Sequence, residues 1–304
     1  MRDHTPLGRG RFSPAGIVPR VTQSFPSGRP ADIDAAGARW LARHEARCHA
    51  LSSREVRELG DGVLLYDPAD REPFWNRLAG AAWPSAPGAF DHRLAEVLAL
   101  FGSLDRIPHL WPMPGFDEPP DLVQRLLAHG FVDVGAGMLM ALDPEAVALD
   151  VAVDPDVTIE RLDGAAPRTD DPSPTIDGIA AVLAQAFTIE QMAVDAIEAD
   201  TRAAMAIASF HALLVRVDGE PAATVRRTTF DGASYLSSIG TRPAFRGRGL
   251  GRLVTSLAAQ ESIAAGSGLT YLGVFAENDV AQRLYARLGF VPIGGPAPDL
   301  LLRA

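Results

Sequence analysis

Arg246-Gly247-Arg248-Gly249-Leu250-Gly251 is a loop rich in glycine and arginine that joins a predicted strand at 234–241 to a predicted amphipathic helix. Glycines at such a junction let the backbone turn sharply and let a ligand approach without Cβ atoms in the way. The unpaired amides at the helix start, together with the helix dipole, favour an anion. Three arginines add positive charge there: Arg246, Arg248 and Arg252. The loop therefore predicts a phosphate or pyrophosphate site.

Two common nucleotide-binding loops do not fit this segment. A P-loop requires Gly-Lys-Ser/Thr, and the chain contains no lysine. The dinucleotide fingerprint G-x-G-x-x-G fails because Val254 stands where the third glycine should be, and the loop lies late in the chain. A different class of phosphate ligand is indicated.

The pattern that fits is Arg/Gln-x-x-Gly-x-Gly/Ala, which Arg246, Gly249 and Gly251 fill. Pro243 precedes it, and the run Asn-Asp-Val-Ala-Gln-Arg-Leu-Tyr-Ala-Arg-Leu-Gly-Phe follows at 278–290. In these features residues 155–304 resemble the GNAT superfamily of N-acetyltransferases, which use acetyl-CoA as the acyl donor. The resemblance implies a mixed α/β fold with a central sheet flanked by helices.

The resemblance also implies which residues hold the co-substrate. Main-chain amides of the loop would bind the CoA pyrophosphate, and the strand before the loop would pair with pantetheine. Asn278 resembles an asparagine that contacts CoA, and it is equally well placed to cap a helix that begins at Asp279. The predicted cofactor-binding residues are Ile239, Gly240, Thr241, Arg246, Gly247, Arg248, Gly249, Leu250, Gly251, Arg252 and Asn278.

Tyr285 occupies the position of the family's usual general acid, which protonates the departing CoA thiolate. The ordinary pKa values of a phenol and a thiol, about 10 and about 8.5, are close enough for this donation. The alternative is a half-buried aromatic residue whose hydroxyl is bonded elsewhere.

The general base is not evident from the sequence. Where family members often carry a glutamate, the strand before the loop offers Ser237 and Ser238. Glu190, Glu277 or a water chain remain alternatives, and His211 is better explained as an ordinary strand residue.

An internal echo suggests that the chain is a tandem of two related halves. Residues 121–132 closely resemble 280–291: in each, a helix ends at glycine and phenylalanine begins a strand. We predict a disordered arm at 1–30, a degenerate GNAT-like domain at 31–150 and a catalytic GNAT domain at 151–304. Each domain is expected to have its own mixed sheet flanked by helices.

The first half lacks the features that carry the chemistry. No arginine–glycine pattern occurs at 83–91, and the tyrosine position is Leu126 or Leu127. We therefore expect no productive CoA binding there. Asn76 and Arg77 could face a site, although packing beside Phe74 and Trp75 is the favoured interpretation.

Composition narrows the remaining possibilities. A net charge of −10 disfavours nucleic-acid binding, and one cysteine excludes an internal disulfide or a cysteine-based metal cluster. No apolar run could span a membrane and no signal peptide is evident, so we expect a cytoplasmic protein that needs no metal.

The sequence thus predicts an acetyl-CoA-dependent N-acetyltransferase whose acceptor is the amine of a small molecule or peptide. A non-catalytic acyl-CoA sensor is the main alternative, and a binder of another phosphate ligand is a weaker one. Oligomeric state is not indicated.

Overall fold

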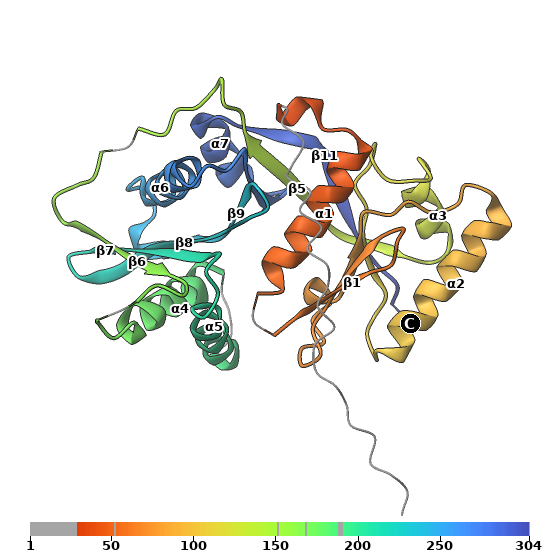
Figure 1. Cartoon of the computed structure of the whole chain (residues 1–304), viewed down its shortest axis with the longest axis horizontal. Helices are drawn as coiled ribbons and strands as arrows, with labels where there is room; N and C mark the ends of the chain where they lie inside the picture. The colour runs from red at the N-terminus through yellow and green to blue at the C-terminus, as the bar shows by residue number, and fades with distance from the viewer. Residues whose placement is uncertain (1–28, 52, 151, 168, 188–190, 304) are drawn as a thin grey trace, which may run out of the picture.

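One mixed sheet runs through the computed structural model, which describes residues 29–51, 53–150, 152–167, 169–187 and 191–303. Its eleven strands follow the order β1-β2-β3-β4-β11-β5-β10-β9-β8-β7-β6 (Figure 1). The prediction of a mixed α/β fold is confirmed. The expectation of a separate sheet in each half is wrong, because strands of the two halves alternate at the centre. The predicted arm falls almost wholly outside the described residues.

The first half contributes three helices, five strands and two short 3-10 turns within the described residues. In chain order these are η1 Pro30–Asp32, α1 Ala35–His49, β1 Glu55–Glu58, β2 Val63–Tyr66, η2 Pro73–Trp75, β3 Arg77–Ala79, α2 Pro87–Ser103, β4 His109–Trp111, α3 Leu122–Ala128 and β5 Val132–Leu142. Helix α2 begins at Pro87, and proline is well suited to the first helical position.

The second half contributes four helices, six strands and one 3-10 turn within the described residues. These are β6 Val157–Asp163, α4 Ser173–Phe187, α5 Gln191–Ala204, β7 Phe210–Val217, β8 Glu220–Phe230, β9 Ala233–Thr241, η3 Pro243–Phe245, α6 Leu250–Ala264, β10 Leu269–Phe275, α7 Asp279–Leu288 and β11 Phe290–Leu301. The last strand begins at Phe290 and runs to Leu301, with register shifts where proline and glycine interrupt it.

The two halves exchange their last strands. Strand β5 pairs antiparallel with β10, and β11 pairs antiparallel with β4. The exchanged strands also pair with each other, so three neighbouring strand pairings join the two halves (Figure 1). Around this pair the order is mirrored: β4 and β3 on one side correspond to β10 and β9 on the other. The mirrored order agrees with the predicted echo, while the domain boundary at residue 150 stays a prediction.

The echoed helix ends have the expected geometry. Gly130 after α3 and Gly289 after α7 have φ values of 89° and 96°, a left-handed conformation that closes the last turn at little cost only for glycine. At Gly289 a Cβ atom would lie 2.3 Å from the Ala146 carbonyl oxygen. Each helix is thus followed directly by the strand that its half exchanges.

Helices cover both faces of the second half's strands. Helices α6 and α7 lie on one side and α4 and α5 on the other, while α1 of the first half lies near the middle of the molecule (Figure 1). Leu236 and Leu272 pack toward α6. Tyr235 and Tyr271 share the opposite core with Cys48 of α1, because neighbouring strand residues face opposite sides. The first half therefore forms part of the second half's core.

Within the described part of the chain, no helix is long and apolar enough to cross a membrane. The same residues contain no group of three or more histidine, cysteine, aspartate or glutamate side chains that could hold a metal ion.

Candidate functional site

The glycine loop has the conformation that its composition predicts. Gly247 and Gly249 have φ values of 80° and 77°, and no described atom lies within 4 Å of a Cβ built on either. Gly249 caps helix α6, which begins at Leu250. No described residue accepts a hydrogen bond from the main-chain amides of 247–252. The loop therefore presents a row of open donors at the positive end of a helix.

The three arginines of the loop differ in what they contact. Arg246 donates to the carbonyl oxygens of Thr241 and Ala186, at 3.3 and 3.2 Å, which braces the loop against the strand and α4. Arg248 donates to Asp156 at 2.6 Å, and Arg252 to the Asp150 carbonyl at 3.3 Å. The Asp156 hydrogen bond raises the pKa of Arg248. All three side chains are exposed and each forms a hydrogen bond at the surface. Their positive charges therefore belong to the same segment as the unpaired amides.

Strands β9 and β10 separate beside this loop. They pair in parallel only from Ala233 with Leu269 to Leu236 with Leu272. Beyond this point β9 still pairs with β8, and β10 with β5. The edges of β9 and β10 that face each other are therefore unpaired over 237–241 and 273–275. We call this opening the β9–β10 splay.

The predicted strand residues lie in this unpaired section. Ile239, Gly240 and Thr241 all follow a bulge at Ser238, which has a φ of 51° and interrupts the register with β8. Gly240 packs closely against α4, since a Cβ there would lie 3.1 Å from Ala186 Cβ. The splay therefore exposes backbone groups of β9 directly upstream of the glycine loop.

Asn278 caps helix α7, as one of its two predicted roles required. Its side-chain oxygen accepts a hydrogen bond of 3.1 Å from the Ala281 amide. The residue is exposed, and the other predicted role, contact with CoA, stays a prediction.

Tyr285 lies on the buried face of α7, with 6 % of its surface exposed. Its ring packs near Phe290 at a centroid distance of 6.2 Å, and no described residue forms a hydrogen bond with its hydroxyl group. Burial raises the pKa of Tyr285 well above its usual value, so the phenol keeps its proton at neutral pH. The alternative expectation placed this hydroxyl group in a hydrogen bond elsewhere, and no described residue provides one. The role of general acid stays a prediction.

The base candidates from the sequence are not brought together. Glu190 lies outside the described residues, and Glu277 is exposed beside the start of α7. His211 contacts Asp163 at 2.7 Å across the β6–β7 pair, which confirms its interpretation as a strand residue.

The corresponding region of the first half is closed by its own chain. Strands β3 and β4 pair in parallel, with Leu78 opposite Leu110 and Ala79 opposite Trp111. Just beyond, Glu118 donates its amide to the Ala81 carbonyl at 3.0 Å and accepts from the Trp83 amide at 2.9 Å. The backbone edge that is free in the β9–β10 splay is therefore occupied here. Asn76 and Arg77 are buried, as packing predicted.

The sequence did not predict a buried polar cluster between the halves. Arg77 Nη2 lies 2.5 Å from Glu45 Oε1, and His49 Nε2 lies 2.8 Å from the same oxygen. The His49 ring meets Tyr235 edge-on at 5.3 Å. Only the spacing of Glu45 and His49, one helical turn apart, is visible in the sequence; the partner Arg77 lies 32 residues further on.

Comparisons with known proteins agree with this geometry. Residues 182–290, which include the β9–β10 splay, the glycine loop and Tyr285, match the model of the acetyltransferase (GNAT) family. Residues 182–290 therefore resemble the GNAT acetyltransferase family, as the loop and the run at 278–290 predicted.

Solved structures extend the likeness to most of the chain. A GCN5-related N-acetyltransferase from Kribbella flavida is 24 % identical with a TM-score of 0.63, over 88 % of this chain and 96 % of that one. Another from Sphaerobacter thermophilus is 17 % identical with a TM-score of 0.60, covering 91 % and 95 %.

A tandem GNAT protein from the clavulanic acid biosynthesis pathway is 16 % identical with a TM-score of 0.59, over 82 % of this chain and 83 % of that one. At these identities the likeness shows the fold alone. No curated protein sequence matches the chain.

Proposed function

We propose that this protein transfers an acetyl group from acetyl-CoA to a primary amine of an acceptor. The observation that carries the proposal is the β9–β10 splay, whose unpaired strand edge leads into a helix start with unpaired amides. A pantetheine arm can pair with such an edge, and a pyrophosphate suits such a helix start.

The chain's own residues would hold the co-substrate in two places. Main-chain groups of Ile239, Gly240 and Thr241 would pair with the pantetheine amides. The amides of 247–252 would bind the pyrophosphate, with Arg248 and Arg252 contributing charge. Asn278 would contact CoA from the start of α7 while it caps that helix.

Tyr285 would act as the general acid. The acceptor nitrogen forms a bond to the acyl carbon, the carbon–sulfur bond breaks, and the sulfur receives a proton from the Tyr285 hydroxyl. The nitrogen loses one proton in return, which restores the phenol through solvent, so that one acyl group and one proton are exchanged overall. The raised pKa of Tyr285 keeps that proton in place until a thiolate forms beside it.

Replacing Tyr285 with phenylalanine tests this role. Loss of a general acid lowers turnover by about a hundredfold or more, whereas acetyl-CoA affinity measured by calorimetry should stay the same. Tyr66→Phe, on β2 of the first half, is the matched control and should change neither value. Unchanged turnover in Tyr285→Phe would remove Tyr285 from the mechanism.

Two further outcomes separate the alternatives. Acetyl-CoA binding without turnover across a broad panel of primary amines would favour a non-catalytic acyl-CoA-binding module. Competition by ADP or ATP as strong as that by CoA would indicate a different phosphate ligand.

A further inference from the structure

Two tyrosines lie side by side immediately before the β9–β10 splay. Tyr235 of β9 is paired with Tyr271 of β10, and their ring centroids are 4.9 Å apart. Both residues are buried in the core that α1 covers. Burial raises the pKa of each phenol well above its usual value, so both keep their protons at neutral pH. The two side chains are therefore matched in surroundings and in charge.

The two hydroxyl groups differ in their partners. The Tyr271 hydroxyl group lies 2.8 Å from His44 Nδ1 on α1, and His44 Nε2 lies 3.1 Å from the Phe230 carbonyl oxygen. Burial lowers the pKa of His44 to about 4, so the neutral ring donates to that carbonyl and accepts from Tyr271. No described residue forms a hydrogen bond with the Tyr235 hydroxyl group. A structural role thus accounts for the hydroxyl group of Tyr271 and not for that of Tyr235.

The Tyr235 hydroxyl group reaches the point at which the two strands separate. Gly273 is the first residue of β10 beyond the section paired with β9. A Cβ atom on Gly273 would lie 3.2 Å from the Tyr235 hydroxyl oxygen, so this oxygen lies beside the backbone of the unpaired edge. The Tyr235 hydroxyl group is therefore at the closed end of the splay.

The closed end of the splay is where the thioester of a bound acyl-CoA would lie. In the proposed function the pyrophosphate binds the amides of 247–252 and pantetheine follows 239–241 toward lower residue numbers. The acyl group then comes next, beside Ser237 and Ser238. The parallel register of Leu236 with Leu272, continued by one residue, sets Ser237 opposite Gly273. The acyl group would thus arrive next to the Tyr235 hydroxyl group.

Tyr285 approaches the same place from the other face of the sheet. It belongs to the core under α6 and α7, whereas Tyr235 belongs to the core that α1 covers. After burial and the charges of Glu45, Arg77 and Cys48, the charge of Tyr285 also acts on the pKa of Tyr235. The two phenols are thus close enough to interact from opposite faces.

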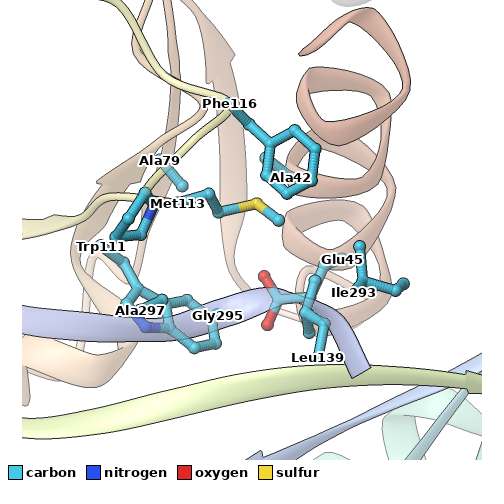
Figure 2. Close-up of a pocket in the computed structure, with 11 residues that line it drawn as sticks. Ala42, Glu45, Ala79, Trp111, Met113, Phe116, Leu139, Ile293, Gly295 and Ala297 are labelled. Carbon is cyan, nitrogen blue, oxygen red and sulfur yellow. The ribbon is translucent and has the colours of Figure 1, made fainter. Parts of the chain in front are cut away.

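The first half holds the Tyr235 ring in place. The His49 ring of α1 meets it edge-on at 5.3 Å, and Glu45 lies 2.8 Å from His49. Figure 2 shows Glu45 projecting from α1 into the space between the halves. The cavity beside Glu45 has a volume of about 20 Å³, which is room for about one water molecule. An acyl group does not fit there, so a thioester would meet Tyr235 in the splay.

We infer that the Tyr235 hydroxyl group donates a hydrogen bond to the carbonyl oxygen of the acyl thioester. When the acceptor nitrogen bonds to the acyl carbon, an electron pair of the carbonyl bond moves to the oxygen, and the hydrogen bond to this oxyanion strengthens. As the carbon–sulfur bond breaks, the carbonyl re-forms and Tyr285 supplies the proton to sulfur. Tyr235 keeps its own proton throughout. The inference rests on the proposed function and adds a second phenol to the same site.

Infrared spectroscopy of bound acetyl-CoA, labelled with carbon-13 at the carbonyl, tests this hydrogen bond without an acceptor. A hydrogen bond to the oxygen lowers the carbonyl stretching frequency, so the band should lie at higher frequency in Tyr235→Phe than in the wild type. Tyr271→Phe, which removes the neighbouring hydroxyl group, is the matched control and should leave the band unchanged. Thermal unfolding shows whether both variants fold. An identical band in Tyr235→Phe and the wild type would overturn the inference.

Turnover measures the same hydrogen bond in the transition state. With a primary amine that the wild type acetylates, Tyr235→Phe should lower kcat by about a hundredfold. The dissociation constant of acetyl-CoA, measured by calorimetry, should stay the same. Acetyldithio-CoA has sulfur in place of the carbonyl oxygen and accepts hydrogen bonds weakly. The ratio of kcat for acetyl-CoA to kcat for this analogue should therefore fall in Tyr235→Phe and not in Tyr271→Phe.

The outcomes separate this inference from the proposed function. If acetyl-CoA does not bind the wild type, the proposed function fails and the inference fails with it. If acetyl-CoA binds but Tyr235→Phe has the carbonyl band and the kcat ratio of the wild type, the inference alone fails. If no amine of a broad panel is acetylated, the carbonyl band decides: a shift confined to Tyr235→Phe supports the inference, and no shift overturns it.

Discussion

The β9–β10 and β3–β4 strand pairs occupy mirrored positions in one sheet, yet only the first remains open beyond its paired section. In the β9–β10 splay the facing edges are free, and a glycine cap in left-handed conformation leads into α6. In the other pair Glu118 occupies the edge, and Pro87 begins α2 after an extended Ala86. Equal topology therefore gives one open strand edge and one closed one.

The difference between the two strand pairs lies in their backbone pairing and not in any single side chain. An unpaired strand edge can form hydrogen bonds with another extended chain, because buried main-chain donors and acceptors must be satisfied. In the second half that partner would be pantetheine. In the first half it is the chain segment that ends at Glu118, and this half contributes α1 to the core behind Tyr235.

The largest effect on acetyl-CoA affinity should come from a substitution at the start of α6. Gly249→Trp places a large side chain in the open space of the loop and requires a φ of 77° that tryptophan adopts poorly. We expect acetyl-CoA affinity to fall by at least about a hundredfold, which corresponds to about 2.7 kcal/mol, as measured by calorimetry.

Gly88→Trp is the matched control at the start of α2. This position is also exposed with open space around its Cβ direction, so the two substitutions add the same bulk at mirrored helix starts. Acetyl-CoA affinity should not change. A loss of affinity in Gly88→Trp would mean that the first half also binds the co-substrate and that the contrast between the halves is wrong.

A smaller effect, on the free energy of unfolding, is expected at Asp117, which precedes the edge-pairing residue Glu118. Burial raises the pKa of Asp117 from 3.8 to about 7, against the hydrogen bond from the Met113 amide and the charge of Arg39. The folded state therefore keeps a proton that the unfolded chain loses above about pH 4. The free energy of unfolding should fall as pH rises from about 4 to about 7, by at most about 1.4 kcal/mol per pH unit from this group.

Asp117→Asn should remove this part of the pH dependence and make the protein more stable than the wild type at pH 8. Denaturant unfolding at several pH values measures both effects. Asp177→Asn, an exposed acid on α4, should leave the slope unchanged. If Asp117→Asn shows the wild-type slope, burial of this carboxyl group does not limit the stability of the closing segment.

The smallest effect should come from the loop charges. Arg248 is exposed and pairs with Asp156, so Arg248→Gln should weaken acetyl-CoA binding only about threefold, and less at high salt. Asp156→Asn releases the arginine and should leave affinity equal or slightly improved. A loss in Arg248→Gln as large as that in Gly249→Trp would mean that side-chain charge, not the main-chain amides, holds the pyrophosphate.

The sequence predicts the second half well because its signals are local. The glycine loop, the cap at Asn278 and the glycine at 289 each act within one turn of a helix, so spacing alone identifies them. The structure confirms their conformations, and the family match confirms the resemblance built on them.

The features that the sequence does not predict depend on contacts between distant residues. Nothing in the run Val132–Leu142 indicates that it pairs with β10, whose paired residues lie 130 to 138 positions further on. Glu45 likewise gives no local sign of burial, because its partner Arg77 belongs to the three-residue strand β3. The shared sheet and the packing of α1 behind Tyr235 arise from such contacts.

The most direct test of the central claim is the stoichiometry of acetyl-CoA binding to the full chain, measured by isothermal titration calorimetry. An open second half and a closed first half predict one site per chain. Two sites per chain would contradict the closure of the β3–β4 edge, and no binding would contradict the assignment of the β9–β10 splay as an acyl-CoA site.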